Sequence, residues 1–172
     1  GYEVIFLPVK ETGILDFEAL DASVNEDTLI VSIMAAHNEI GVLQEITAIG
    51  ELCKQRGALF HTDAAQAIGK IPLDVQAMNI DLMSISGHKI YGPKGIGALY
   101  IRRRPRVRIN PLIDGGGQER GLRSGTLSTP LCVGLGEACE IANQNLSHEP
   151  ARLLELRQRL YEGIISAIPT TL

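Results

Sequence analysis

Short apolar runs and segments with helical spacing alternate along the first hundred residues. The run at 28–36 is almost uninterrupted and rich in β-branched side chains, which is typical of a strand buried on both faces. Other runs are shorter and are bounded by glycine, proline or polar residues. We expect strands at residues 2–9, 28–36, 58–63, 81–86 and 95–102.

Helical patterns separate most of these strands. A short helix is expected over 15–24, with Asp16 as its N-cap, and a longer one over 45–57. Gly57 stands where a glycine often follows the last helical turn. A short helix is also expected at 74–79.

The C-terminal part, residues 129–168, reads as two helices broken near Pro150. Apolar residues recur along one stripe of the second helix at Leu153, Leu156, Leu160 and Ile164.

Alternating strands and helices predict an α/β fold, a three-layer α/β/α arrangement with a mostly parallel sheet. No helix separates the runs at 81–86 and 95–102, so this pair is expected to be antiparallel and the sheet mixed.

Composition and charge argue against some classes of function. The net charge of −4 argues against a nucleic-acid partner, and no apolar run is long enough to span a membrane. The basic run RRRPRVR at 102–108 is interpreted as a solvated strand end or a salt-bridged surface. The three cysteines, Cys53, Cys132 and Cys139, form no CxxC pair, which favours a reducing compartment. Cys132 and Cys139 lie seven residues apart, so they would share one helix face, and both are expected to be buried.

Polar residues follow three of the expected strands. HNEIG at 37–41, DAAQ at 63–66 and SGHK at 86–89 come directly after apolar runs. In open α/β sheets, ligands bind beyond the carboxyl ends of the strands. Singly, each residue also has a structural explanation, such as capping a turn or lying in solvent. Together, the three sets favour a ligand site.

The chemistry of these groups points to one cofactor. A P-loop is excluded because Pro93 stands where its lysine should be, and the scattered histidines predict no metal site. An amine, a carboxylate, an amide, hydroxyls and an imidazole match the aldehyde, ring nitrogen, ring hydroxyl and phosphate of pyridoxal 5'-phosphate.

Four motifs closely resemble the cysteine desulfurases of iron–sulfur cluster assembly, which are class V, fold-type I pyridoxal-phosphate enzymes. The motifs are HNEIG, HTDAAQAIGKIPLD, SISGHKIYGPKGIGALYIRRRPRVR and GGGQERGLRSGT. The resemblance implies that residues 1–146 are the central part of the large cofactor-binding domain. It also implies that 147–172 form a helix leading toward a small domain. We expect the chain to be an inner part of a longer protein.

The resemblance assigns roles to individual residues. Lys89 matches the lysine that bonds to the cofactor aldehyde, and Lys94 is interpreted as a loop residue. Asp63 matches the acid that pairs with the ring nitrogen, and Gln66 the donor to the ring hydroxyl. The phosphate contacts match Ser86 and His88.

Two further matches complete the set. Asn38 matches a residue that touches cofactor and substrate, although His37 stands where the family commonly has asparagine. Thr126 matches a threonine that reaches the phosphate of the neighbouring subunit's cofactor, which implies a homodimer.

The implied reaction converts L-cysteine to L-alanine and leaves the sulfur on an enzyme cysteine as a persulfide. Iron–sulfur scaffolds and other sulfur acceptors are the implied partners. The loop cysteine, the substrate-binding arginine and the upstream phosphate cup do not match any residue here, so the segment alone is expected to be inactive. A selenocysteine lyase or a non-catalytic scaffold-binding segment are the alternatives. The expected compartment is the cytoplasm, with the mitochondrial matrix as the alternative.

Overall fold

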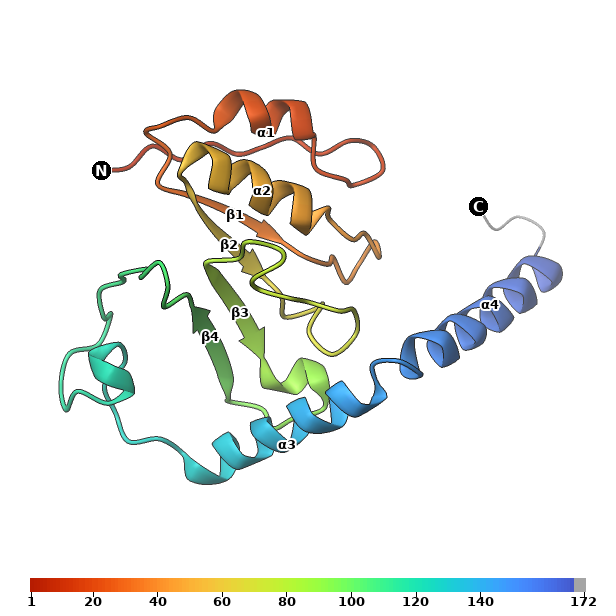
Figure 1. The fold of residues 1–172 in the computed structure, drawn as a ribbon. Helices are drawn as coiled ribbons and strands as arrows, with labels where there is room; N and C mark the ends of the chain where they lie inside the picture. Colours follow the sequence, from red (N-terminus) through yellow and green to blue (C-terminus); the bar gives the residue numbers. More distant parts are fainter. Residues whose placement is uncertain (169–172) are drawn as a thin grey trace.

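The computed structural model describes residues 1–168 and shows a four-stranded mixed sheet with helices packed beside it (Figure 1). The strands lie in the order β1-β2-β3-β4, at Ile30–Met34, Leu59–Asp63, Leu82–Ser86 and Gly97–Ile101. β1, β2 and β3 are mutually parallel, and β4 is antiparallel to β3. The α/β class, the mixed sheet and the antiparallel last pair are therefore confirmed.

The helices α1 (Phe17–Ser23) and α2 (Ile46–Arg56) begin and end much as their sequences predict. The Asp16 carboxylate accepts hydrogen bonds from the backbone N–H groups of Glu18 and Ala19, which confirms the N-cap. Gly57 ends α2 in the left-handed conformation, with φ of 75°.

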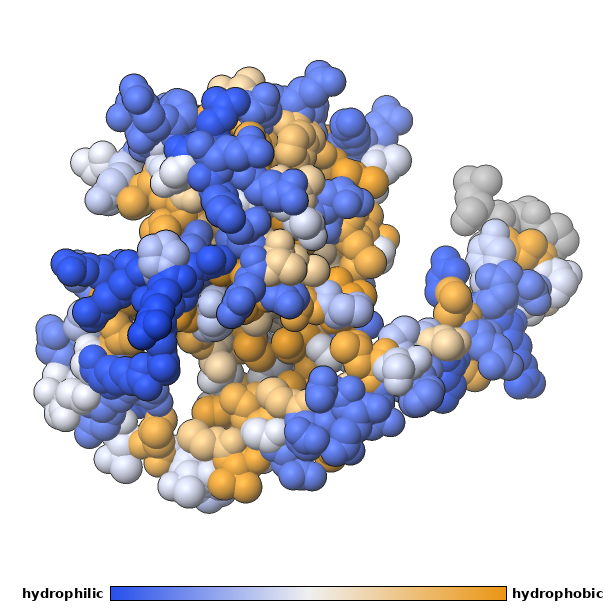
Figure 2. Space-filling view, in the orientation of Figure 1, coloured by the Kyte–Doolittle hydropathy of each residue, from blue (hydrophilic) through white to orange (hydrophobic). Residues whose placement is uncertain are grey.

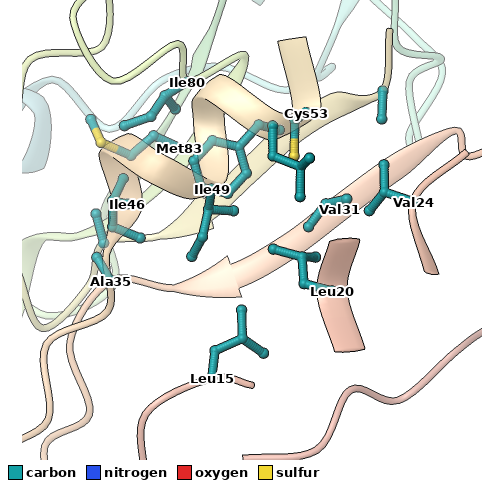
Figure 3. Close-up of a cluster of buried hydrophobic side chains, with 14 of the residues drawn as sticks. Leu15, Leu20, Val24, Val31, Ala35, Ile46, Ile49, Cys53, Ile80 and Met83 are labelled. Carbon is teal, nitrogen blue, oxygen red and sulfur yellow. The ribbon is translucent and has the colours of Figure 1, made fainter. Parts of the chain in front are cut away.

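The main core lies between α1, α2 and one face of the sheet. Figure 3 shows Leu20, Val31, Ile49 and Cys53 converging between these elements. Phe60 and Thr62 of β2 point into the same core because alternate residues of a strand face the same side. The remaining residues of β2 face the other side of the sheet, where the candidate site begins.

Two short elements differ from the sequence prediction. Residues 2–9 do not form a strand: among the described residues no strand pairs with them, and Val9 makes only an isolated bridge to Leu15. Residues 74–79 form a turn, because the Asp74 carboxylate binds the N–H groups of Gln76 and Ala77, and Asn79 leaves the helical region with φ of 50°.

The C-terminal part forms α3 (Thr129–Asn145) and α4 (Glu149–Ala167), with the break before Pro150 as predicted. α3 packs against the 3₁₀ helix η1 (Gly87–Ile90), and Figure 2 shows apolar surface over its first half. The predicted apolar stripe of α4 is exposed among residues 1–168. No helix in this range combines the length and apolarity needed to cross a bilayer.

The prediction that Cys132 and Cys139 are both buried is only partly correct. Cys53 is buried and Cys132 half-buried, but Cys139 is exposed. α3 turns Ala138 inward: a Cβ at Gly92 would lie 3.2 Å from its methyl carbon. The next residue, Cys139, is rotated about 100° away from that contact.

Alkylation should therefore distinguish the thiols. Burial, followed by the negative charge of Asp81, raises the pKa of Cys53 to about 11, so very little reactive thiolate forms at pH 8. We expect iodoacetamide to modify Cys139 in the native protein and Cys53 only after denaturation, as read by mass spectrometry. Equal labelling rates for the two cysteines would contradict this packing.

Candidate functional site

The candidate residues gather where β1, β2 and β3 end. Strand pairing sets Asp63 opposite Met34 on one side and Ser84 on the other. The ladder continues one residue further, since Ala35 N–H donates to the Asp63 carbonyl at 2.9 Å and Ala64 N–H to the Ser84 carbonyl at 3.0 Å. These bonds hold the segments that follow β1, β2 and β3 side by side.

Asp63 is the last residue of β2 and is exposed at this edge. One oxygen of its carboxylate, Oδ1, accepts the Ala65 N–H at 2.9 Å, which fixes the side chain at the start of the following turn. Among the described residues, Oδ2 has no hydrogen-bond partner. Asp63 therefore presents an acceptor oxygen at the strand end.

His61 lies two residues before Asp63 on the same face of β2. Its Nδ1 is 2.7 Å from Ser32 Oγ of β1, and its Nε2 is 3.0 Å from Ser84 Oγ of β3. Burial lowers the pKa of His61, and the negative charge of Asp63 partly offsets that effect. A neutral imidazole is thus held by a hydroxyl on each neighbouring strand.

The segment after β3 carries Ser86, His88 and Lys89. It turns at once into η1, and Ser86 Oγ lies 3.3 Å from His88 Nδ1. Glycine is required at position 87, because a Cβ there would lie 2.9 Å from the Ile96 carbonyl oxygen. This close approach allows the tight turn that places the imidazole and the amine directly after the strand.

Lys89 is half-buried, whereas Lys94 is exposed beyond Pro93. Within residues 1–168, no hydrogen-bond acceptor or carboxylate engages the Lys89 amine. The positive charge of Lys89 contributes to lowering the pKa of Lys70, so these two lysines lie near one another. The geometry thus favours Lys89 over Lys94 as the amine of the site.

A hollow of about 300 Å³ opens beside these groups. Its lining includes His37, Asn38, Gln66 and Lys70, together with apolar residues. Asn38 is exposed in the loop after β1, and Gln66 is half-buried in the turn after β2. The structure therefore brings Asn38 and Gln66 to one hollow, while Asp63, Ser86, His88 and Lys89 lie along the same sheet edge.

Thr126 is not joined to this group. It is exposed in the loop between the 3₁₀ helix η2 (Glu119–Gly121) and α3, and no described hydrogen bond links it to the other candidates. Its expected reach to a neighbouring subunit stays a prediction.

Sequence reasoning missed two residues of this region. His61 alternates with buried Phe60 and Thr62, a signal that it faces the side of Asp63. Lys70 follows Gln66 by four residues, the spacing that brings two side chains together over one helical turn. No cluster of metal-binding side chains is found in the part of the chain that the structure describes.

The fold and this edge define an α/β protein with an amine, a carboxylate and an amide gathered beyond parallel strands. The sequence profile of the family described as "Aminotransferase class-V" matches residues 1–172, and the chain belongs to this family.

Within this family, the chain is similar to proteins named cysteine desulfurase. The chain is 59% identical over 169 residues to "Cysteine desulfurase" of Homo sapiens, covering 98% of this chain and 37% of the relative. It is 58% identical over 170 residues to "Cysteine desulfurase IscS" of Ehrlichia chaffeensis, covering 98% and 42%.

A solved "NIFS-LIKE PROTEIN" superposes with a TM-score of 0.91 at 45% identity, over 96% of this chain and 46% of that one. The structure "SspA in complex with cysteine" gives a TM-score of 0.78 at 47% identity, over 81% and 40%. The chain thus spans less than half the length of each of these proteins.

Proposed function

We propose that this chain is the cofactor-binding part of a cysteine desulfurase that converts L-cysteine to L-alanine and passes the sulfur to an enzyme cysteine as a persulfide. The observation that carries the proposal is the placement of Asp63, Ser86, His88 and Lys89 along one sheet edge, with Gln66 in the hollow beside it. Among the reactions of class V proteins, this one is supported by the relatives named cysteine desulfurase.

The residues present fit pyridoxal phosphate by the chemistry of their donors and acceptors. Ser86 and His88 offer a hydroxyl and an imidazole to the phosphate, and Lys89 offers an amine to the aldehyde. Asp63 has a carboxylate oxygen without a described partner, which suits a protonated ring nitrogen. Gln66 offers an amide donor to the ring hydroxyl. When bound, this cofactor supplies an electron sink for bonds at the substrate's α-carbon.

The chain's own residues would bind, orient and move protons. Lys89 Nζ would hold the cofactor and, once displaced by the substrate amine, carry a proton to and from the substrate carbon. Asp63 would keep the ring nitrogen protonated through a charge-assisted hydrogen bond. Asn38, on the rim of the hollow, would contact cofactor and substrate.

The sulfur acceptor would be a cysteine other than the three present. Cys53 is in the core, and neither Cys132 nor Cys139 lines the hollow. The acceptor thiol and the group that binds the substrate carboxylate would come from elsewhere in the longer protein. For this reason we propose that residues 1–172 alone do not release sulfide from cysteine.

Four properties of the whole protein follow as proposals. Thr126 would contact the phosphate in a neighbouring subunit of a homodimer. Residues 1–146 would belong to the large domain, with 147–172 leading toward a small one. Iron–sulfur scaffolds and other sulfur-acceptor proteins would receive the sulfur. The compartment would be the cytoplasm or the mitochondrial matrix; the relative of Arthroderma benhamiae is described as mitochondrial by its name.

A substrate assay tests the proposed reaction. The full-length protein, loaded with pyridoxal phosphate, should form alanine from L-cysteine and release sulfide when a thiol reductant is present. L-Selenocysteine is the parallel substrate. Alanine from selenocysteine but not from cysteine would overturn the proposal in favour of a selenocysteine lyase, and turnover of neither would overturn both assignments.

A further inference from the structure

Lys70 reaches the candidate site from the turn that follows β2. Ile68 N–H donates to the Ala64 carbonyl at 2.9 Å, and Ile71 N–H to the Ala67 carbonyl at 3.1 Å. These bonds wind the segment into helical turns, so Gln66 and Lys70 emerge on the same side. Both side chains line the hollow beside Asn38.

Gly69 fixes this turn against the segment that carries Lys89. Its φ is 71°, and a Cβ at this position would lie 2.9 Å from the Ala142 methyl carbon and 3.2 Å from Ile90 Cγ2. Ile90 is the residue after Lys89. The backbone on one side of Lys70 is thus packed directly on η1, which explains why the two lysines lie near one another.

In the hydrogen bond between Lys70 and Gln66, Lys70 is the donor and Gln66 the acceptor. Lys70 Nζ lies 3.1 Å from Gln66 Oε1. An ammonium group has donors only, so the amide atom that faces it must be the oxygen. The Gln66 NH₂ group therefore points away from Lys70, with its two donors available to a ligand.

Lys70 is the positively charged group in the described lining of the hollow. Partial burial lowers the pKa of Lys70, and the positive charge of Lys89 lowers it further. His37 is the other titratable residue of the described lining, from the loop after β1, and Asp63 and His88 lie along the same edge. On the α3 side the turn meets the apolar Ala142. The hollow itself is therefore lined by groups that favour an anionic oxygen.

We propose that Lys70 is a positioning residue that holds the Gln66 oxygen and so directs the Gln66 NH₂ group as a hydrogen-bond donor to the ring oxygen of pyridoxal phosphate. This role rests on the proposed function above. It assigns to Lys70 an effect that acts through a second side chain, without contact between Lys70 and the reacting atoms.

A spectroscopic double-mutant cycle tests the role in the cofactor-loaded full-length protein. The variants are Lys70→Met, Gln66→Leu, their combination and Lys70→Arg, with Lys54→Met on α2 as a control for loss of an exposed positive charge. The measurement is the pH midpoint of the change in the cofactor's visible absorption. Thermal unfolding of each variant checks that the fold is retained.

Lys70→Met should raise this midpoint by about one pH unit, because a donor to the ring oxygen favours the form that holds one proton fewer. Lys70→Arg keeps a charged donor and should restore most of the shift. Lys54→Met should leave the midpoint unchanged. In the Gln66→Leu background, Lys70→Met should shift the midpoint by less than half as much, because the amide that it positions is absent.

Three outcomes would contradict the proposed role of Lys70. An equal shift from Lys70→Met in both backgrounds would show that charge alone acts and would overturn the positioning role. A midpoint unmoved by Lys70→Met would also overturn it, while leaving the proposed function intact. If the unsubstituted protein shows no cofactor absorption, the proposed function fails, and this role fails with it.

Discussion

Replacing Lys89 by alanine should abolish covalent attachment of pyridoxal phosphate and lower turnover of L-cysteine by at least about a thousandfold. Loss of a positioned proton-transfer group alone costs about 10²- to 10⁴-fold, and loss of the covalent link adds to that cost. Lys89 is the amine that the turn after β3 places at the sheet edge, half-buried and without a described acceptor. Absorption spectra and alanine formation by the full-length protein measure the two effects.

Lys94→Ala is the matched control. It removes a lysine only five positions away, but one that is exposed beyond Pro93. We expect this variant to keep the cofactor absorption band and most of the activity. If Lys94→Ala lost the band while Lys89→Ala kept it, the assignment of the amine would be wrong.

Replacing Arg102 by methionine should lower the free energy of unfolding by about 3 kcal/mol, because it leaves the carboxylate of Asp81 unpaired in a largely desolvated position. Arg102 Nε lies 3.0 Å from Asp81 Oδ1, and both side chains are less than one-fifth exposed. Arg102 Nη2 also donates to the carbonyls of Ile80 and Val75, at 2.8 and 3.1 Å. Asp81 Oδ2 accepts the Phe60 N–H at 2.9 Å, so the pair ties β2 and β4 together.

Urea denaturation measures this effect, with Arg103→Met as the control. Arg103 is the next residue but is exposed, so its replacement should change stability by less than about 0.5 kcal/mol. Equal losses for the two variants would show that the pair between Arg102 and Asp81 does not stabilise the fold. In Figure 2, hydrophilic surface gathers beside the end of β4, where the other arginines of the basic run are exposed.

The sheet could be predicted because its strands depend on local patterns. The apolar run at 28–36 and the alternation of Phe60 and Thr62 with polar neighbours mark strands from their own residues. The connection between the runs at 81–86 and 95–102 is too short for a crossover helix, which was enough to predict the antiparallel pairing of β4. The positions of Asp63 and Ser86 at strand ends, and of His88 just beyond one, then indicated most of the candidate site.

The features that were missed depend on contacts between distant parts of the chain. A strand at 2–9 needs a partner, and none is found among residues 1–168. The bonds from His61 to Ser32 and Ser84 depend on the register of three strands. The approach of Lys70 to Lys89 depends on Gly69 packing against Ile90, which sequence spacing alone does not reveal.

We propose that Lys89 carries the cofactor at this sheet edge. The most direct test of this proposal is borohydride reduction of the full-length protein loaded with pyridoxal phosphate, followed by proteolysis and mass spectrometry of the labelled peptide. We expect the stable cofactor adduct to be found on Lys89. An adduct found on Lys94 or Lys70 instead would contradict it.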